Sequence, residues 1–136
     1  MGSKKVLDKA LINNFLPEGL LLHFDITEVL ELGDVPSKTI FFEIYLEERN
    51  EILGSYDSSA YESKGFTEIT VQDFPIRGRA VYLKIKRRRW RHKKRSNEII
   101  RNDFSYVAEG SGFTQELSDF LKETGRYKGG YDNQHR

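Results

Sequence analysis

The feature that most constrains this chain is a basic segment from Lys84 to Arg95. Ten of its twelve residues are Lys, Arg or His, none is Asp or Glu, and the chain's only Trp, Trp90, lies inside it. Such a segment repels itself unless a polyanion or an acidic surface neutralises it. Just before it, apolar and polar residues alternate over 80–86, the pattern of a β-strand with one buried face. We therefore expect a strand over 80–91 whose basic end runs past the edge of a sheet.

The net charge of +1 hides a strong asymmetry along the chain. Residues 77–101 contain 12 basic residues and one acidic residue, a net charge of +11. Residues 1–76 contain 6 basic and 14 acidic residues (−8), and residues 102–136 contain 4 and 6 (−2). This pattern indicates an acidic body with one basic belt, which either binds a polyanion or is masked by the acidic part.

The N-terminal half predicts one helix followed by one β-hairpin. Apolar residues at helical spacing predict a helix over 4–16 that ends before Pro17. The alternation over 20–32 predicts a strand, with a bulge or break at Thr27–Glu28. Residues 39–48 alternate regularly and predict the second, antiparallel strand of the hairpin.

The C-terminal half predicts a second hairpin and a second helix. Residues 54–64 are small and polar and predict a loop, followed by a short strand over 68–72. The strand over 80–91, a turn at 93–97 and a strand over 98–107 predict a basic ribbon. Thr114 as N-cap and Gly125 as C-cap frame a helix, placed at 113–124.

The expected fold class is therefore α+β, a small antiparallel sheet of two β-hairpins with an N-terminal and a C-terminal helix. We expect a single domain over 1–125, with an acidic half at 1–64, a basic ribbon half at 65–109, and a disordered polar tail at 126–136.

The basic ribbon is the expected functional site. A two-stranded ribbon fits the DNA major groove, and residues 87–95 would project from it toward phosphates. Charge runs are more often plain solvated faces, but a run this dense without acids favours polyanion binding. Trp90 either stacks on a base or packs against the ribbon. The predicted DNA-binding residues are Arg77, Arg79, Lys84, Lys86, Arg87, Arg88, Arg89, Trp90, Arg91, His92, Lys93, Lys94, Arg95 and Arg101.

The residues give little sign of enzyme chemistry, and we expect no enzyme, no cofactor and no metal. The chain has no Cys, and its three His residues lie far apart in the sequence. No nucleophile motif or Gly-rich phosphate loop is recognisable. Glu43, Glu47, Glu48 and Glu51 have the chemistry for a divalent ion, but a solvated face or a counter-surface for the belt is favoured. No apolar run reaches a membrane span and no secretory signal is seen, so we expect a cytoplasmic protein, associated with the nucleoid through its DNA binding.

Three stretches resemble the N-terminal region of bacterial insertion-sequence transposases of the DDE type. They are Leu16–Leu21, Phe66–Gly78 and Val81–Trp90, and Ile69–Gly78 is the most specific part. The resemblance covers about 16–124 and includes a helix like the one expected at 113–121. It implies recognition of element-end DNA, with the catalytic DDE carboxylates in another domain or another chain. Related transposases hold a similar hairpin with zinc bound by Cys pairs, which this chain lacks, so the ribbon must be held by packing and turns.

Three functions stay open from the sequence. The first is a non-catalytic DNA-binding module of a transposase, acting on duplex DNA with a steep dependence on salt. The second is a protein-interaction subunit that docks a separate catalytic transposase. The third is a module for single-stranded DNA or RNA, motivated by Trp90 and the Tyr-bearing loop.

Overall fold

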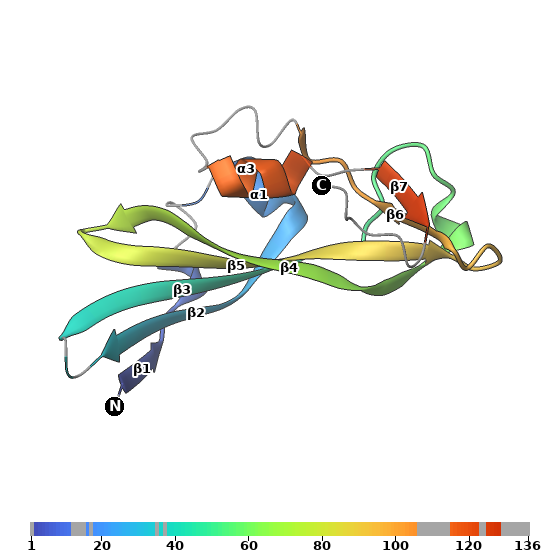
Figure 1. Ribbon diagram of the computed structural model, residues 1–136. Helices are drawn as coiled ribbons and strands as arrows, with labels where there is room; N and C mark the ends of the chain where they lie inside the picture. The colour runs from blue at the N-terminus through green and yellow to red at the C-terminus, as the bar shows by residue number, and fades with distance from the viewer. Residues whose placement is uncertain are drawn as a thin grey trace.

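The protein is a mixed β-sheet with two short helices, described by a computed structural model over residues 2–11, 16, 18–34, 36, 38–105, 115–122 and 125–128 (Figure 1). Within these residues it has seven strands. The elements in chain order are β1 (Gly2–Val6), η1 (Lys9–Leu11), α1 (Glu18–His23), β2 (Phe24–Asp34), β3 (Thr39–Glu48), η3 (Ser58–Ala60), β4 (Tyr61–Ile76), β5 (Arg79–His92), β6 (Glu98–Arg101), α3 (Gln115–Lys122) and β7 (Gly125–Lys128). The expected α+β fold of two hairpins flanked by helices is wrong, because the chain is mostly β.

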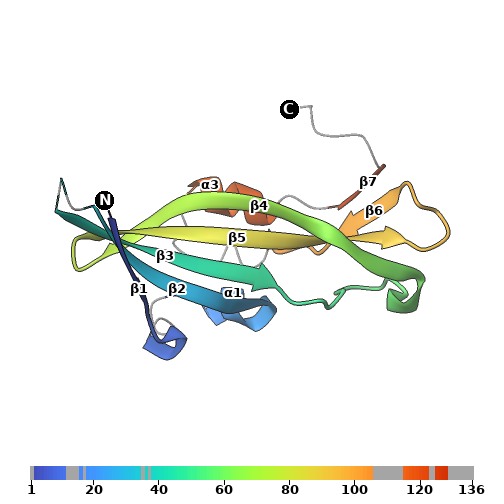
Figure 2. The same ribbon diagram turned by 90° about the horizontal axis from the view of Figure 1, so that it is seen from below.

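Strand β5 is the centre of the sheet. The strand order is β1-β2-β3-β5-β6-β7, and β4 pairs with the other side of β5 along most of its length. On the first side, β5 pairs in parallel with β3 over 81–86 and then antiparallel with β6 at Trp90 and Arg91. On this side, β5 therefore has β3 as its neighbour along its first part and β6 at its end. The sheet is long and narrow (Figure 2).

The hairpin of β2 and β3 confirms the strongest prediction from the alternating pattern. Strand β3 has the bounds that the alternation predicts, and it pairs antiparallel with β2. The register shifts between Ile26 and Glu28, which confirms the irregularity expected there. The local pattern was enough to predict this hairpin because the side chains on the two faces of its strands differ in polarity.

The N-terminal helix expected over 4–16 is wrong for the residues that the structure describes. Gly2–Val6 form β1, which pairs antiparallel with β2 through Lys4–Leu32 and Val6–Leu30, and only one 3-10 turn follows at Lys9–Leu11. Residues 12–15 lie outside the described part of the chain. The free edge of β2 offers backbone partners that outweigh a weak helical pattern. A helix does form at α1, where a strand start was expected.

The second hairpin also differs from the prediction. Strand β4 covers Tyr61–Ile76 instead of 68–72, and it is the long antiparallel partner of β5. Strand β6 ends at Arg101, so the basic strand is enclosed by neighbours and does not project as a finger. The turn at 93–97 and helix α3 lie where they were expected, while Gly125–Lys128 form a strand where a tail was expected. Residues 106–114 and 129–136 lie outside the described part.

The buried residues form two clusters on opposite sides of β5. The larger cluster joins strand residues such as Leu83 and Ile85 to α1 and α3, which lie on one side of the sheet (Figure 1). The smaller cluster consists of Tyr61, Trp90 and Ile100, with Ile52 and Ala60 packed against it. The buried positions of β5 change from odd numbers up to Arg87 to the even numbers 90 and 92. Because side chains alternate along a strand, the second cluster lies on the other side of β5.

Candidate nucleic-acid interface

Arg87, expected at the tip of a projecting ribbon, is fully buried in the larger cluster. Its guanidinium donates from Nη1 to the carbonyl oxygen of Phe120 in α3 at 2.7 Å, and from Nη2 to that of Asn102. It also lies over the rings of Phe104 and Phe120, with centroids 5.3 and 5.7 Å away. Arg87 therefore fastens α3 and the chain after β6 onto the sheet, and it is not accessible to DNA.

The carboxylate of Glu48 fills the place where β3 ends and β6 begins beside β5. It accepts from the backbone N–H of Arg88 at 2.8 Å and from Nδ2 of Asn102 at 2.7 Å. Asn102 also donates to the carbonyl oxygen of Glu51 and accepts from the N–H of Leu53. Burial raises the pKa of the Glu48 carboxyl above its ordinary value, and these hydrogen bonds and the charge of Arg87 offset part of the rise. Glu48 therefore has a structural role, because its carboxylate accepts the hydrogen bonds that the backbone of Arg88 and the amide of Asn102 donate where β3 ends. The sequence does not favour a metal site at Glu48.

Trp90 and His92 are also buried; Trp90 belongs to the smaller cluster, and His92 packs against it. The indole Nε1 donates to Oδ1 of Asn50 at 2.9 Å. The imidazole of His92 packs edge-on against the ring of Tyr61, with centroids 5.0 Å apart. Of the two interpretations of Trp90, the structure places it in packing, and its ring is not available as a stacking platform for a base.

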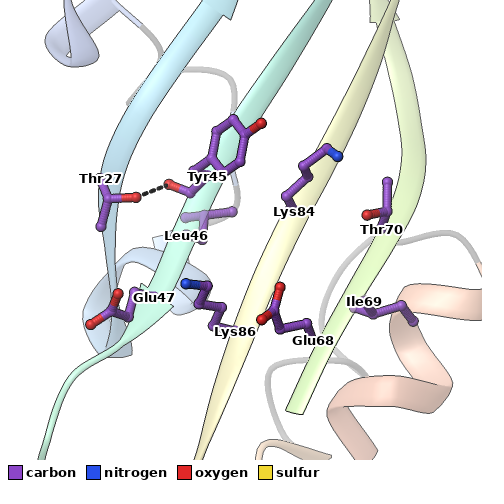
Figure 3. A pocket seen from close by; sticks show the side chains of 9 residues that line it. All are labelled: Thr27, Tyr45, Leu46, Glu47, Glu68, Ile69, Thr70, Lys84 and Lys86. Atoms are coloured by element: carbon purple, nitrogen blue, oxygen red, sulfur yellow. Dashed lines mark hydrogen bonds between the residues drawn. The ribbon is translucent and has the colours of Figure 1, made fainter. Parts of the chain in front are cut away.

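Lys84, Lys86 and Arg88 lie on the sheet face opposite α3 and are matched there by carboxylates. Lys84 lies 3.7 Å from Glu43, and Arg88 lies 3.5 Å from Glu47. Lys86 is paired in register with both Glu47 and Glu68, and it lines a hollow of about 280 Å³ between them (Figure 3). Three cations therefore face three carboxylates, and this face offers no excess of positive charge to a polyanion.

A second group of arginines gathers on the other side of the sheet, beyond α3. Arg89 and Arg91 alternate with the buried Trp90, so both point to the side opposite the smaller cluster. Arg91 is paired with Ile99 of β6, which puts Arg101 on the same side. Two residues along a strand rise about 6.7 Å, and neighbouring strands are about 4.8 Å apart. The three residues therefore form a compact patch, called here the arginine patch.

Arg91 of the arginine patch has a weak acidic partner. Glu62, across the strand pair from Arg91, has its carboxylate 4.0 Å from Nη2, and both side chains are partly exposed. Such a pair contributes little. The register of β4 shifts between Ser63 and Phe66, and this bulge brings Lys64 and Gly65 opposite Arg89. A Cβ added to Gly65 would lie 3.0 Å from Nη2 of Arg89, so the missing side chain makes room for the guanidinium.

The remaining predicted residues lie at the two ends of β5. Lys93, Lys94 and Arg95 are exposed in the turn that leads to β6, whereas Arg77 and Arg79 are exposed at the β4–β5 turn. Fourteen residues of β5 separate the two turns, about 45 Å of extended strand (Figure 1). The predicted set is therefore divided into a buried group, a neutralised face, the arginine patch with its adjoining turn, and a distant turn.

Sequence reasoning missed some of the structural partners of this region. Glu43, Glu47 and Glu48 do form the counter-surface for the belt that the sequence offered as one of two interpretations. Nothing in the local pattern marks Asn102 as a partner, or places Glu48 inside the protein. Lys64 was assigned to a loop, although Lys64-Gly65 is a readable bulge signal in a strand. Among the described residues, no group of three or more His, Cys, Asp or Glu side chains is placed to hold a metal ion. No helix in that part of the chain is long and apolar enough to cross a membrane.

The arrangement is one that suits binding of a polyanion by two neighbouring strands and a turn. Comparison of this chain with models of protein families, with curated proteins and with solved structures finds no match.

Proposed function

We propose that this chain is the non-catalytic, DNA-binding N-terminal module of a transposase, and that it binds duplex DNA through the arginine patch. The observation that carries the proposal is the placement of Arg89, Arg91 and Arg101 on one side of two neighbouring strands. The exposed Lys93 and Lys94 continue this positive surface into the adjoining turn.

The physical support is the contrast between two basic surfaces of the same sheet. On the face of Lys84, Lys86 and Arg88 a phosphate would have to displace carboxylates. At the arginine patch, Arg91 has only a 4.0 Å contact with Glu62, and both of these side chains are partly exposed. Arginine binds phosphate through two parallel hydrogen bonds, and each neutralised phosphate releases counterions. DNA binding is therefore favoured at the patch.

The transposase assignment is supported by the resemblance over about 16–124 described above. In that arrangement the catalytic carboxylates belong to another domain or chain, and this module supplies contact with the element end. Co-purification of this chain with the product of the adjoining reading frame tests the assignment, and a DDE catalytic protein there would support it. Strand cleavage by this chain alone would contradict it.

DNA binding is tested by titrating a labelled duplex at several salt concentrations, beginning at about 50 mM. The variant Arg89→Ala/Arg91→Ala should bind more weakly, and the slope of log K against log salt should become shallower by about 2, since each lost phosphate contact removes about 0.9. The matched control is Arg77→Ala/Arg79→Ala, which removes the same charge from exposed positions at the far end of β5. It should keep most of the affinity and the slope.

The outcomes separate the three functions. An equal loss in both variants would show that charge alone matters and would refute the arginine patch as the site. Preference for a single-stranded oligonucleotide over the duplex would favour a single-strand or RNA module. No binding to either at about 50 mM salt, together with capture of the catalytic partner, would favour a protein-interaction subunit.

A further inference from the structure

The turn between β5 and β6, residues 93–97, is held by the buried imidazole of His92. Nδ1 of His92 accepts hydrogen bonds from the backbone N–H groups of Lys94 and Arg95, at 3.1 and 3.0 Å. Because Nδ1 is the acceptor, the ring proton is on Nε2. The ring is buried at 8% exposure and packs edge-on against Tyr61. A buried side chain thus fixes the backbone of an exposed turn.

Three further contacts fix the same turn. The N–H of Lys93 donates to the carbonyl oxygen of Ala60 at 2.8 Å, and the N–H of Glu98 closes the turn on the carbonyl oxygen of Arg95 at 2.8 Å. The carboxylate of Glu98 accepts from Nε of Arg95 at 2.7 Å and from the hydroxyl of Tyr61 at 2.5 Å. The entry, the middle and the exit of the turn are therefore each tied to the smaller cluster.

The side chains at the tip of this turn are exposed and are not used by the fold. Ser96 and Asn97 make no side-chain hydrogen bond within the part of the chain that the structure describes. Asn97 is not among the described residues with positive φ, so its backbone does not require Asn. A solvated turn needs no buried His and no buried carboxylate to hold it. Pre-ordering of this kind lowers the cost of binding, which is the reason to expect a ligand at the tip.

We infer that the turn over 93–97 enters the DNA major groove and reads bases there, with Asn97 and Ser96 at base edges and Lys93 and Lys94 at the flanking phosphates. This inference rests on the proposed function and names how the same surface selects its DNA. The groove is about 12 Å wide and admits a protein element as broad as a two-stranded β-ribbon. Strands β4 and β7 flank β5 and β6 here, so the part that would enter the groove is the exposed turn over 93–97. The amide of Asn matches the N6 and N7 positions of adenine, and the hydroxyl of Ser suits several bases.

The arginine patch lies directly behind the turn, which gives the two surfaces separate tasks. Arg91 and Lys93 are two residues apart, so the patch leads into the turn along the chain. Contacts of arginines with phosphates position a protein on the duplex without reading sequence, whereas base contacts specify it. His92 acts as a positioning residue, because it touches no DNA and orients the backbone that carries the tip.

The experiment is selection of preferred sequences from a duplex pool with a randomised central segment, using the full chain. The wild type should enrich a motif. Asn97→Ala should lose the preference at one position or more by roughly tenfold or greater, while affinity for the unselected pool and its salt slope stay the same. Lys93→Ala/Lys94→Ala should weaken binding to all sequences alike and make the salt slope shallower by about 2.

The role of His92 is tested by two further variants in the same selection. His92→Phe keeps a ring against Tyr61 but removes the acceptor, so it should bind the unselected pool with the wild-type salt slope and enrich a weaker motif. His92→Asn places an acceptor oxygen near the position of Nδ1 and should restore the motif in part. Fluorescence of Trp90 checks that each variant is folded. If the His92 variants acted only by destabilising the protein, the enriched motif and the binding to the unselected pool would weaken together.

The results distinguish this inference from the proposed function. If the wild type binds duplex DNA but enriches no motif, or if Asn97→Ala and Ser96→Ala enrich the wild-type motif unchanged, the turn does not read bases and the inference is overturned while DNA binding stands. If the wild type binds no duplex, the proposed function and the inference both fail.

Discussion

Replacement of Arg87 by Met should destabilise the protein far more than any other loss of one charge from the basic segment. Met has a similar length but cannot donate to the carbonyl oxygens of Phe120 and Asn102, which Arg87 satisfies at zero exposure. Hydrogen bonds from charged donors contribute about 1.5–3 kcal/mol each. The variant also leaves Glu48, whose carboxyl Arg87 stabilises by its charge, with less compensation.

We expect the free energy of unfolding to fall by about 3–5 kcal/mol, the range for removing one partner of a buried charged network. Urea denaturation followed by the fluorescence of Trp90 measures it, because this single Trp is buried at 1% exposure. The control is Arg79→Met, an identical change at an exposed position of the same strand, which should shift the free energy by no more than about 0.5 kcal/mol.

The double variant Arg87→Met/Glu48→Gln separates the causes of the loss. If the uncompensated carboxylate contributes, the two changes together should cost less than the sum of their separate costs. A loss below about 1 kcal/mol for Arg87→Met alone would refute the assignment of Arg87 as a buried fastener of α3.

Two further predictions concern single positions. Burial raises the pKa of Glu48, so the stability that this carboxyl contributes is complete below the ordinary pKa of Glu and is lost as the pH rises through the folded-state pKa. The free energy of unfolding of the wild type relative to Glu48→Gln should therefore fall as the pH rises above the ordinary pKa of Glu, about 4.3, and an increase over that range would show that burial does not raise the pKa. Gly65→Ala should lower the free energy of unfolding more than Gly54→Ala does. Both glycines have φ near +90°, so each substitution adds a strain of about 1–2 kcal/mol, but only at Gly65 would the new Cβ meet Arg89. Equal losses in urea denaturation would show that the contact with Arg89 has no effect on stability.

Sequence patterns predicted the elements that are amphipathic over their whole length. Strand β3 and the irregularity at Thr27–Glu28 follow from alternation of residues that face the core and the solvent. Strand β5 is also correct within a residue at each end. In β3 up to Leu46 and in β5 up to Ile85, local polarity and tertiary burial agree, so the period alone was enough there.

The patterns failed where a partner distant in sequence decides the structure. A helical pattern near Val6 yields to backbone pairing with β2, because β2 has a free edge. The parallel pairing of β3 with β5 requires the chain over 49–60 to cross to the far side of β5, where β4 begins, and no local signal specifies this crossing. Parallel neighbours need such a long connection, whereas hairpins are the default for consecutive strands.

The candidate site was predicted in composition but not in geometry. The basic segment was correctly identified as a strand, yet a row of Arg and Lys reads as solvent-facing because Arg is almost never fully buried without partners. The carbonyl oxygens of Phe120 and Asn102 and the carboxylate of Glu48 supply those partners. Three of the fourteen predicted residues are consequently inside the protein: Arg87, Trp90 and His92.

The change of buried side along β5 makes this strand intolerant of length variation. Arg87 belongs to the cluster beneath α3, and Trp90, three residues later, belongs to the cluster on the other side. One residue inserted between them would rotate the rest of the strand by one position, turning Trp90 and His92 toward the arginine patch and the arginines into the smaller cluster. Among homologous chains, insertions and deletions should therefore be found in the 49–60 connection, and the spacing between Arg87 and Trp90 should stay constant even where the residues differ.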